Sequence, residues 1–251
     1  MKFAILAAGE GSRLASEGVS LPKPLVQVAG EAMVDRLVRI FTDCGADDIF
    51  IITNNIMPET KQHLQALVDK GWPLHYIVKT TPSSMHSFYE LAPLLGEGKF
   101  CLTTVDTIFS ETEFKRYIQA FKQADEQLDG MMAVTDFVDD EKPLWISTDS
   151  QLNITGFFDS LQAFETATAG TDGQSVCKYI SGGIYCLRST AFKTLSWCVE
   201  SGQSRMRNFQ RQLIADGLHL RAWPFTKILD VDHAADIQKA NAFLTSSQMT
   251  L

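Results

Sequence analysis

The sequence predicts an α/β fold, a three-layer α/β/α sandwich around a mostly parallel, mixed β-sheet. Segments of strand and helix character alternate through the first half of the chain, as they do in the strand–helix–strand units of parallel sheets. The expected strands are also apolar on both faces, which is typical of strands that helices cover on each side. The 251 residues suit one large domain, because no internal repeat or long linker divides them.

Each expected element has a local reason in the sequence. An apolar run at residues 2–8 ends in a Gly-rich turn and predicts the first strand, and apolar residues at helical spacing predict a helix at 32–44. Pro58 favours the start of a helix at 58–70, and Ser110 with Glu113 three residues later favours a helix start at 110.

The remaining elements follow from the same patterns. Further helices are expected at residues 84–95, 110–124, 190–200, 205–216 and 233–244. Further strands are expected at residues 48–53, 74–78, 99–104, 130–135, 144–148, 154–158, 179–187, 218–224 and 227–230. The polar stretch at residues 163–175 predicts a mobile loop and a candidate lid.

Charge and composition exclude several classes of partner. The net charge of −8 disfavours nucleic acid and anionic membranes, since both attract clustered Lys and Arg. No apolar run approaches the ~18–20 residues that a membrane-spanning helix needs. The first residues are interpreted as a strand and not as a signal peptide. The five cysteines are odd in number and show no C-x-x-C spacing, which predicts free thiols and a cytoplasmic protein.

The strongest motif is the turn that follows the first strand, Leu-Ala-Ala-Gly-Glu-Gly-Ser-Arg-Leu at residues 6–14. Glycines let backbone N–H groups converge on an anion. A dinucleotide fingerprint would need Gly or Ala at the place of Leu14, and a Walker A loop would need a Lys directly after a glycine. What remains is G-x-G-S-R-L, with Lys23 ten residues after Arg13 in the segment Leu-Pro-Lys-Pro-Leu.

This combination resembles the nucleotidyltransferase family that makes nucleoside-diphosphate sugars and other activated head groups, including the cytidylyltransferases. The resemblance implies the Rossmann-like mixed sheet of the nucleotide-diphospho-sugar transferase type. It also implies a nucleotide-binding half at residues 1–135, and an acceptor-binding half with a closing helix at 136–251. In the implied reaction a phosphate oxygen of the acceptor attacks the α-phosphate of a nucleoside triphosphate, and pyrophosphate leaves.

The resemblance also assigns roles to residues of the turn and of a later segment. Arg13 is expected on the leaving β- and γ-phosphates, and Lys23 on the α-phosphate or on the acceptor phosphate. The expected nucleotide-binding residues are Ala8, Gly9, Gly11 and Ser12 in the turn, together with Ser83 and Ser84 near the base or ribose. For the two later serines an ordinary helix cap is the alternative interpretation.

Three aspartates are the candidate ligands of a divalent cation, Mg²⁺, which such a transfer usually needs. Asp106 follows an apolar strand, at the end where α/β sheets bind ligands. Asp230 and Asp232 stand two residues apart and so on the same side of a strand, and the family's motif favours Asp230. Asp236 is expected to be a first-turn helix charge, and His233 a capping residue.

The acceptor half matches the family less closely. Gly183 belongs to a Gly-Ile-Tyr segment that lines the acceptor pocket in the family, and Lys178 is a candidate for an acceptor phosphate. Asp159 and Ser160 stand where sugar-specific members often carry a Glu-Lys pair. The acceptor is therefore open between a sugar 1-phosphate and a smaller phosphorylated alcohol, and the nucleobase is also open. Pro22 counts against guanylyltransferases of the molybdenum cofactor, which favour an acidic residue there.

The expected partners are a nucleoside triphosphate and a small phosphorylated acceptor, and a homo-oligomer stays open. The alternative function is a catalytically silent nucleotide-binding regulatory protein of the same fold. Such proteins usually lack the Arg, the Lys or a metal-binding Asp, whereas Arg13, Lys23 and Asp106 are all present. A dinucleotide-dependent oxidoreductase is disfavoured because Leu14 replaces its third glycine.

Overall fold

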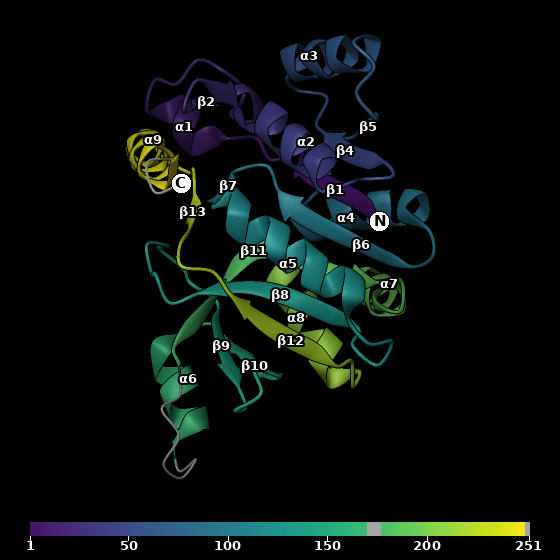
Figure 1. Ribbon diagram of the computed structural model, residues 1–251, viewed down its shortest axis with the longest axis vertical. Helices are drawn as coiled ribbons and strands as arrows, with labels where there is room; N and C mark the ends of the chain where they lie inside the picture. Colours follow the sequence, from purple (N-terminus) through teal and green to yellow (C-terminus); the bar gives the residue numbers. More distant parts are fainter. Residues whose placement is uncertain (170–176, 249–251) are drawn as a thin grey trace.

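The computed structural model describes residues 1–169 and 177–248 of the chain. Within these residues a nine-stranded sheet forms the centre of the molecule (Figure 1). Four of its strands are β1 (Lys2–Ala7), β4 (Ile49–Thr53), β5 (Leu74–Val78) and β6 (Lys99–Thr104). They lie in the order β5-β4-β1-β6 and all pair in parallel, as expected for the first half of the chain.

The second half of the sheet joins this parallel block through β11 (Tyr179–Arg188), which is antiparallel to β6. The other strands of this half are β8 (Gly130–Thr135), β9 (Trp145–Thr148), β10 (Ile154–Phe158) and β12 (Leu220–Pro224). β8 ends at Thr135, the last residue of the expected nucleotide-binding half. It nevertheless pairs with β11 and β12, which belong to the second half of the chain. The sheet is therefore mixed, and β11 is the strand that connects its two parts.

Helices cover both faces of the sheet, which confirms the three-layer sandwich. The apolar side chains of β1 alternate, so that Phe3 and Ile5 join one core cluster while Ala4 and Leu6 join the other. The first cluster lies under α2 (Met33–Asp43), α3 (Pro58–Asp69) and α5 (Glu111–Gln123). The second lies under α4 (Ser84–Leu95), α7 (Ala191–Glu200) and α8 (Met206–Ala215).

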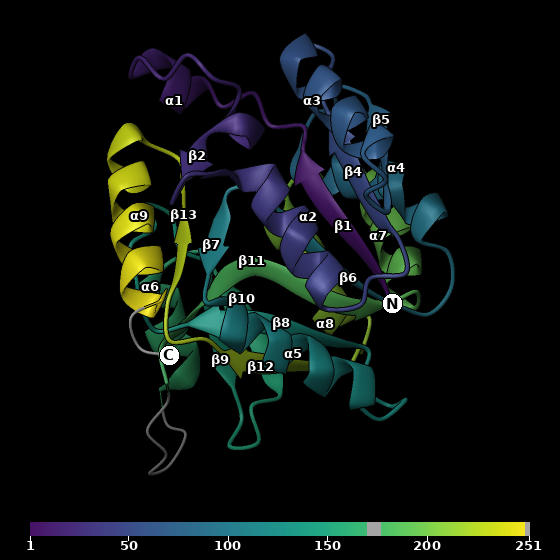
Figure 2. The same cartoon turned by 45° about the horizontal axis from the view of Figure 1, so that its top comes forward.

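A third, smaller cluster joins the two ends of the chain. The C-terminal helix α9 (Ala234–Gln248) lies beside the N-terminal segment in both ribbon views (Figures 1 and 2). Its buried Ala240 and Leu244 pack in one cluster with Leu14, Val26 and Leu229. The short strands β7 (Thr107–Phe109) and β13 (Ile228–Asp230) pair antiparallel beneath it. The segment around the Gly-rich turn is thus held by residues from the far end of the chain.

Several short elements were not expected from the sequence. They are α1 (Ser12–Ser16), the 3-10 turn η1 (Lys23–Leu25), β2 (Gln27–Val28), β3 (Glu31–Ala32), β7 and α6 (Leu161–Thr168). The expectation of a loop from residue 163 is wrong for its first part, because α6 runs to Thr168. Ser160 Oγ caps this helix by accepting from the Ala163 N–H at 3.1 Å, and Phe164 is buried. Residues 170–176, on which the rest of the lid expectation falls, lie outside the described residues.

None of the helices described for this chain has the length and apolar character needed to cross a membrane.

Tyr117 joins two strands of the sheet through its hydroxyl group. The hydroxyl donates to the Met131 carbonyl at 2.5 Å and accepts from the Cys186 N–H at 2.9 Å, in the interior. Tyr117→Phe leaves both backbone groups unsatisfied, so we expect the free energy of unfolding to fall by about 1–3 kcal/mol. Tyr76→Phe removes an exposed hydroxyl that donates to Gln65. This variant should change the free energy of unfolding by less than about 0.5 kcal/mol. Urea unfolding of both variants measures the difference, and equal values would contradict the bridging role.

Candidate active site

The Gly-rich turn is held from behind by Asn54, which directly follows β4 and is 1% exposed. Its side-chain amide donates to the carbonyls of Ala8 and Gly9 at 3.2 and 3.3 Å. Because a trans peptide places its C=O and N–H on opposite sides, the N–H groups of Gly9 and Glu10 point away from Asn54. In the described part of the chain, no protein acceptor is recorded for the backbone N–H groups of residues 9–13. The turn is therefore free to bind an anion.

Gly11 lets the turn pack directly against η1. Its φ of +62° lies in the left-handed region, and an added Cβ would lie 2.9 Å from Lys23 Cβ. A side chain at this position would therefore both strain the backbone and displace Lys23. The G-x-G turn and the later Pro-Lys pair belong to one motif in the sequence. In the structure they are in contact through Gly11 and Lys23.

Lys23 joins two of the predicted aspartates. Its ammonium pairs with the carboxylate of Asp106 and with Asp232 Oδ1, the latter at 2.7 Å, and its side chain is only 10% exposed. Arg13 binds the other oxygen of Asp232 at 2.7 Å. The backbone keeps the third aspartate beside them, because Asp230 lies opposite Thr107 in the β13–β7 pair. The structure thus brings together Arg13, Lys23 and all three aspartates.

The charges of this cluster shift the pKa values of its members. Burial opposes the charged form of Lys23, but the carboxylates of Asp106 and Asp232 outweigh it and raise the pKa of Lys23 above its usual range. Burial also opposes ionisation of Asp232, yet Lys23 and Arg13 hold its pKa below the usual range. Asp230 is exposed where it lines the cavities described below, although much of the protein lies around its carboxylate. This enclosure, with the charges of Asp106 and Asp232, raises the pKa of Asp230 to about 8.

The donor set fits a hard divalent cation. Three carboxylates lie together, and burial, with the added charges of Asp106 and Asp232, raises the pKa of Asp230; a cation would offset these charges. Within the described residues, no group of three or more His, Cys, Asp or Glu side chains is positioned to hold a metal ion, so the protein would supply fewer than three such ligands. Mg²⁺ suits such a site, since it commonly uses one or two carboxylates and takes its other ligands from water and substrate phosphates.

Two connected cavities flank the cluster. The first, of about 320 Å³, is called the loop cavity and is lined by Lys23, Asp106, the Gly-rich turn at residues 8–10, and the 81–84 segment. Ser83 and Ser84 therefore lie where a nucleotide on the turn would meet them. Ser83 also caps α4, because its Oγ accepts from the His86 N–H at 3.5 Å. Both interpretations of Ser83 from the sequence are compatible with this position.

The second cavity, of about 340 Å³, is called the central cavity. It shares Ser83, Ser84, Thr104 and Asp106 with the loop cavity and continues to Asp230, Gly183 and Tyr185. Because β11 runs antiparallel to β6, its first residues lie at the edge where β6 ends. Gly183 has a φ of +71°, and an added Cβ would lie 3.1 Å from Thr107 Oγ1.

One wall of the central cavity carries neutral hydrogen-bonding groups. Gln210 donates to the Tyr185 hydroxyl at 3.3 Å and accepts from Ser181 at 3.2 Å. Burial raises the pKa of Tyr185 to about 12, so its hydroxyl stays protonated at neutral pH.

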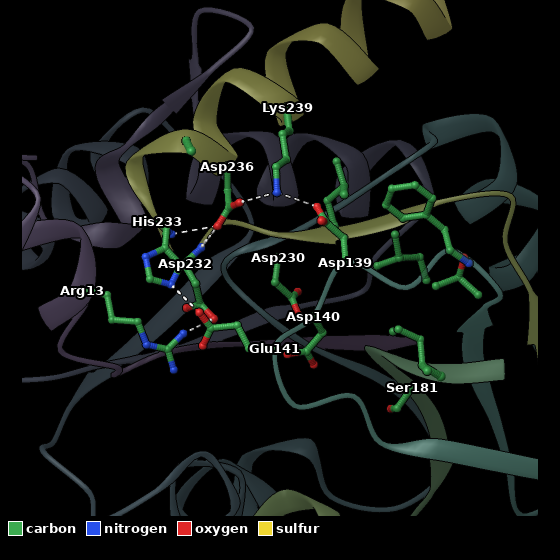
Figure 3. Close-up of a pocket in the computed structure, with 17 residues that line it drawn as sticks. Arg13, Asp139, Asp140, Glu141, Ser181, Asp230, Asp232, His233, Asp236 and Lys239 are labelled. Carbon is green, nitrogen blue, oxygen red and sulfur yellow. Dashed lines mark hydrogen bonds and ion pairs between the residues drawn. The ribbon is translucent and has the colours of Figure 1, made fainter. Parts of the chain in front are cut away.

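A third cavity, of about 290 Å³, lies on the far side of Asp230 and Asp232 (Figure 3). Lys239 spans it by pairing with Asp139 at 2.8 Å and with Asp236 at 3.2 Å. Asp236 also accepts from the backbone N–H groups of Asp232 and His233, as expected for a first-turn helix charge. These contacts fix the start of α9, and with it the position of Asp232.

Other predicted residues lie apart from this cluster. His233 binds Glu17 of the α1 segment through its ring at 2.5 Å, so it ties α9 to the turn through its side chain. Lys178, expected at the acceptor phosphate, lines none of these three cavities and pairs with Glu165 at 2.7 Å on the surface. Asn54 was missed, although a polar residue directly after an apolar strand was a usable signal. Lys142, which lines the central cavity, was not predicted from the sequence either.

Comparison with known proteins gives one family and several relatives. A family model described as the MobA-like NTP transferase domain matches residues 3–213. Glucose-1-phosphate thymidylyltransferase of Neisseria gonorrhoeae is 31% identical over 129 residues, covering 49% of this chain and 43% of the relative. The bifunctional IPC transferase and DIPP synthase of Thermococcus kodakarensis is 30% identical over 117 residues, covering 46% and 26%. The matches therefore span less than half the length of these curated relatives.

Solved structures match over nearly the whole chain. The inositol-1-phosphate CTP transferase of T. maritima aligns with a TM-score of 0.75 at 15% identity, covering 98% of this chain and 96% of that one. A CMP:2-keto-3-deoxy-manno-octonic acid synthetase complexed with CTP aligns with a TM-score of 0.71 at 16% identity, covering 97% and 98%. At these identities the likeness shows the fold, and it agrees with the predicted Rossmann-like type.

Two glycines separate backbone strain from the contact with Lys23. Gly11 and Gly18 both have positive φ, but an added Cβ at Gly18 meets nothing within 4 Å. Gly11→Ala and Gly18→Ala should each lower the free energy of unfolding by about 1–2 kcal/mol. Only Gly11→Ala displaces Lys23, so it alone should weaken binding of the nucleoside triphosphate that binds best among CTP, UTP, GTP, ATP and dTTP, by about tenfold or roughly 1.4 kcal/mol. Calorimetric titration checks this, and equal binding by the two variants would contradict the expected role of the contact.

Proposed function

This chain belongs to the MobA-like NTP transferase family, and we propose that it transfers a nucleoside monophosphate group from a nucleoside triphosphate to a small phosphorylated acceptor. One observation carries the proposal. The anion-ready turn and Lys23 line the loop cavity, and Asp106 lies where this cavity opens into the central cavity, which Asp230 also lines. Arg13 and Asp232 are joined to them through the Lys23–Asp232 and Arg13–Asp232 ion pairs. The junction of the two cavities is where an α-phosphate and an attacking oxygen would have to meet.

In the proposed reaction the two cavities hold the two substrates. The turn at residues 8–12 and Arg13 bind the β- and γ-phosphates, and Lys23 binds the α-phosphate. A phosphate oxygen of the acceptor forms a new bond to the α-phosphorus, while the bond from that phosphorus to the β-phosphate oxygen breaks. Pyrophosphate leaves with the electron pair. No general base is needed, because the acceptor phosphate is already an anion, so catalysis rests on positioning and charge neutralisation.

Lys23 has two sets of partners in this proposal. Its pairing with Asp106 and Asp232 keeps its ammonium charged and directed at the junction. A bound phosphate would share this ammonium with the aspartates. Asp106 and Asp230 are the proposed ligands of Mg²⁺, with Asp232 beside them, and the cation would supply additional neutralisation of the phosphate charge.

The central cavity is the proposed acceptor site. Its volume of about 340 Å³ suits a small molecule, and Gly183 leaves space beside Thr104 and Thr107. The named relatives use different bases and acceptors, since they include a thymidylyltransferase and a 2-aminoethylphosphonate cytidylyltransferase. The test must therefore offer several nucleotides, including GTP because of the family's MobA-like description.

The direct test measures pyrophosphate release. CTP, UTP, GTP, ATP and dTTP are offered with Mg²⁺ against a panel of sugar 1-phosphates and phosphorylated alcohols. Asp106→Asn should lower kcat by about 10²-fold or more, because it removes charge from the reacting centre. The matched control is Asp43→Asn, which changes an exposed carboxylate at the end of α2 and should keep full turnover. Tight nucleotide binding without release in any combination would instead indicate the nucleotide-binding regulatory protein.

Metal removal gives a separate prediction. EDTA should abolish turnover, and excess Mg²⁺ should restore it. Asp230→Asn removes one proposed ligand, so it should raise the Mg²⁺ concentration for half-maximal rate by about tenfold, within the range for lost metal contacts. Asp43→Asn should not change this concentration. Full turnover in EDTA would refute the assignment of the aspartates to a metal.

A further inference from the structure

Three cations line the central cavity beyond Asp106 and Asp230, in a part of the wall that also carries Asp140. Lys142, Arg205 and Arg207 border this cavity, and all three also border a neighbouring cavity of about 690 Å³. Lys142 follows β8 in a connecting segment, whereas the two arginines lie at the start of α8. The proposed function gives none of these three residues a role.

The lining residues show which end of the cavity these cations occupy. The loop cavity and the central cavity share Ser83, Ser84, Thr104 and Asp106, so the nucleotide end is there. The neighbouring cavity has no lining residue in common with the loop cavity. The cations it shares with the central cavity therefore lie at the end remote from the nucleotide.

The charges of the three cations are not equally neutralised. Arg207 pairs with Asp159 at 2.6 Å and donates to the Lys142 carbonyl at 3.0 Å, so its charge is offset and it holds the segment that carries Lys142. For the side chains of Lys142 and Arg205, no hydrogen bond or ion pair is recorded within the described residues. No acidic residue stands in the first turn of α8, where the helix dipole would favour one. Two cations therefore remain available to an anion.

The attacking phosphate cannot use these cations and also reach the α-phosphate. Its oxygen must lie at the junction beside Lys23 and Asp106, at the opposite end of the cavity. The neutral wall of Ser181, Tyr185 and Gln210 lines the same cavity and suits hydroxyl groups. The cavity thus offers a phosphate position, a hydroxyl-binding wall and a second anion position.

We propose that the acceptor carries a second anionic group, a carboxylate or a phosphate, which binds Lys142 and Arg205 at the end of the cavity remote from the nucleotide. This inference rests on the proposed function, because it assigns the substrate class of the same site. It predicts that a phosphorylated acid binds better than the corresponding phosphorylated alcohol.

Binding by calorimetry tests the inference without turnover. The probes are glycerol 3-phosphate, 3-phosphoglycerate and phosphoethanolamine, whose second group is neutral, anionic and cationic. Glucose 1-phosphate and glucuronic acid 1-phosphate form a second matched pair. Each acid should bind about tenfold more tightly than its neutral counterpart, as one charge-assisted hydrogen bond would give. Phosphoethanolamine should show no such gain.

Variants locate the effect. Arg205→Gln and Lys142→Gln should each reduce the advantage of the acids about tenfold or abolish it, while binding of the neutral probes stays unchanged. Arg116→Gln and Lys193→Gln are the controls, since both residues are exposed and line none of the cavities above. These controls should keep the full advantage.

Several outcomes would overturn the inference. They are equal binding of acid and alcohol, tighter binding of phosphoethanolamine, and failure of every probe to bind at millimolar concentration. An equal loss for all probes in Arg205→Gln would also overturn it, because Arg205 would then bind the phosphate that the probes share. The pyrophosphate assay decides the proposed function separately, so the two failures are distinguishable.

Discussion

The pairing of Lys23 with Asp106 and Asp232 is the interaction on which the rest of the site depends. It joins residues that are 83 and 209 positions apart in the sequence. A buried ammonium next to two carboxylates is stable only when all three are held in place, since removing one partner leaves an unpaired charge. Three features of the fold hold these groups in place. Gly11 packs against Lys23, and Asp106 directly follows the end of the β6–Val105 segment. Asp236 at the start of α9 accepts from the backbone N–H of Asp232.

The reversal of direction at β11 gives the site its second wall. In the parallel block, β1 and β6 end at the same edge, so the Gly-rich turn and Asp106 are neighbours. A further parallel strand would present only its last residue at that edge. Because β11 is antiparallel to β6, it brings its first residues there, and Ser181 and Gly183 line the central cavity. One mixed sheet thus positions both cavities without a second domain.

The sequence predicted the long elements well, and it named several of the residues that the structure brings together around Lys23. Apolar periodicity determined the long helices and central strands, because burial follows the same periods. Short elements such as α1 and β7 were missed, since they form through contacts with distant parts of the chain. The turn and Lys23 were predicted because their motif is local, and Asp106 because it follows an apolar strand at the end where such sheets bind ligands. Lys142 gave no local signal, and Lys178 was assigned by position although its ion pair with Glu165 holds it elsewhere.

The packing of α9 on the N-terminal segment has a consequence for the chain during synthesis on the ribosome. The first half can form its parallel strands early, because β1, β4, β5 and β6 all lie within residues 2–104. Asp230 and Asp232, and the apolar side chains of α9 that cover Leu14 and Val26, emerge long after the Gly-rich turn. A nascent chain therefore has the Gly-rich turn but lacks two of the three carboxylates. The complete site therefore cannot form before residues 230–244 have been synthesised and α9 can pack on the N-terminal segment.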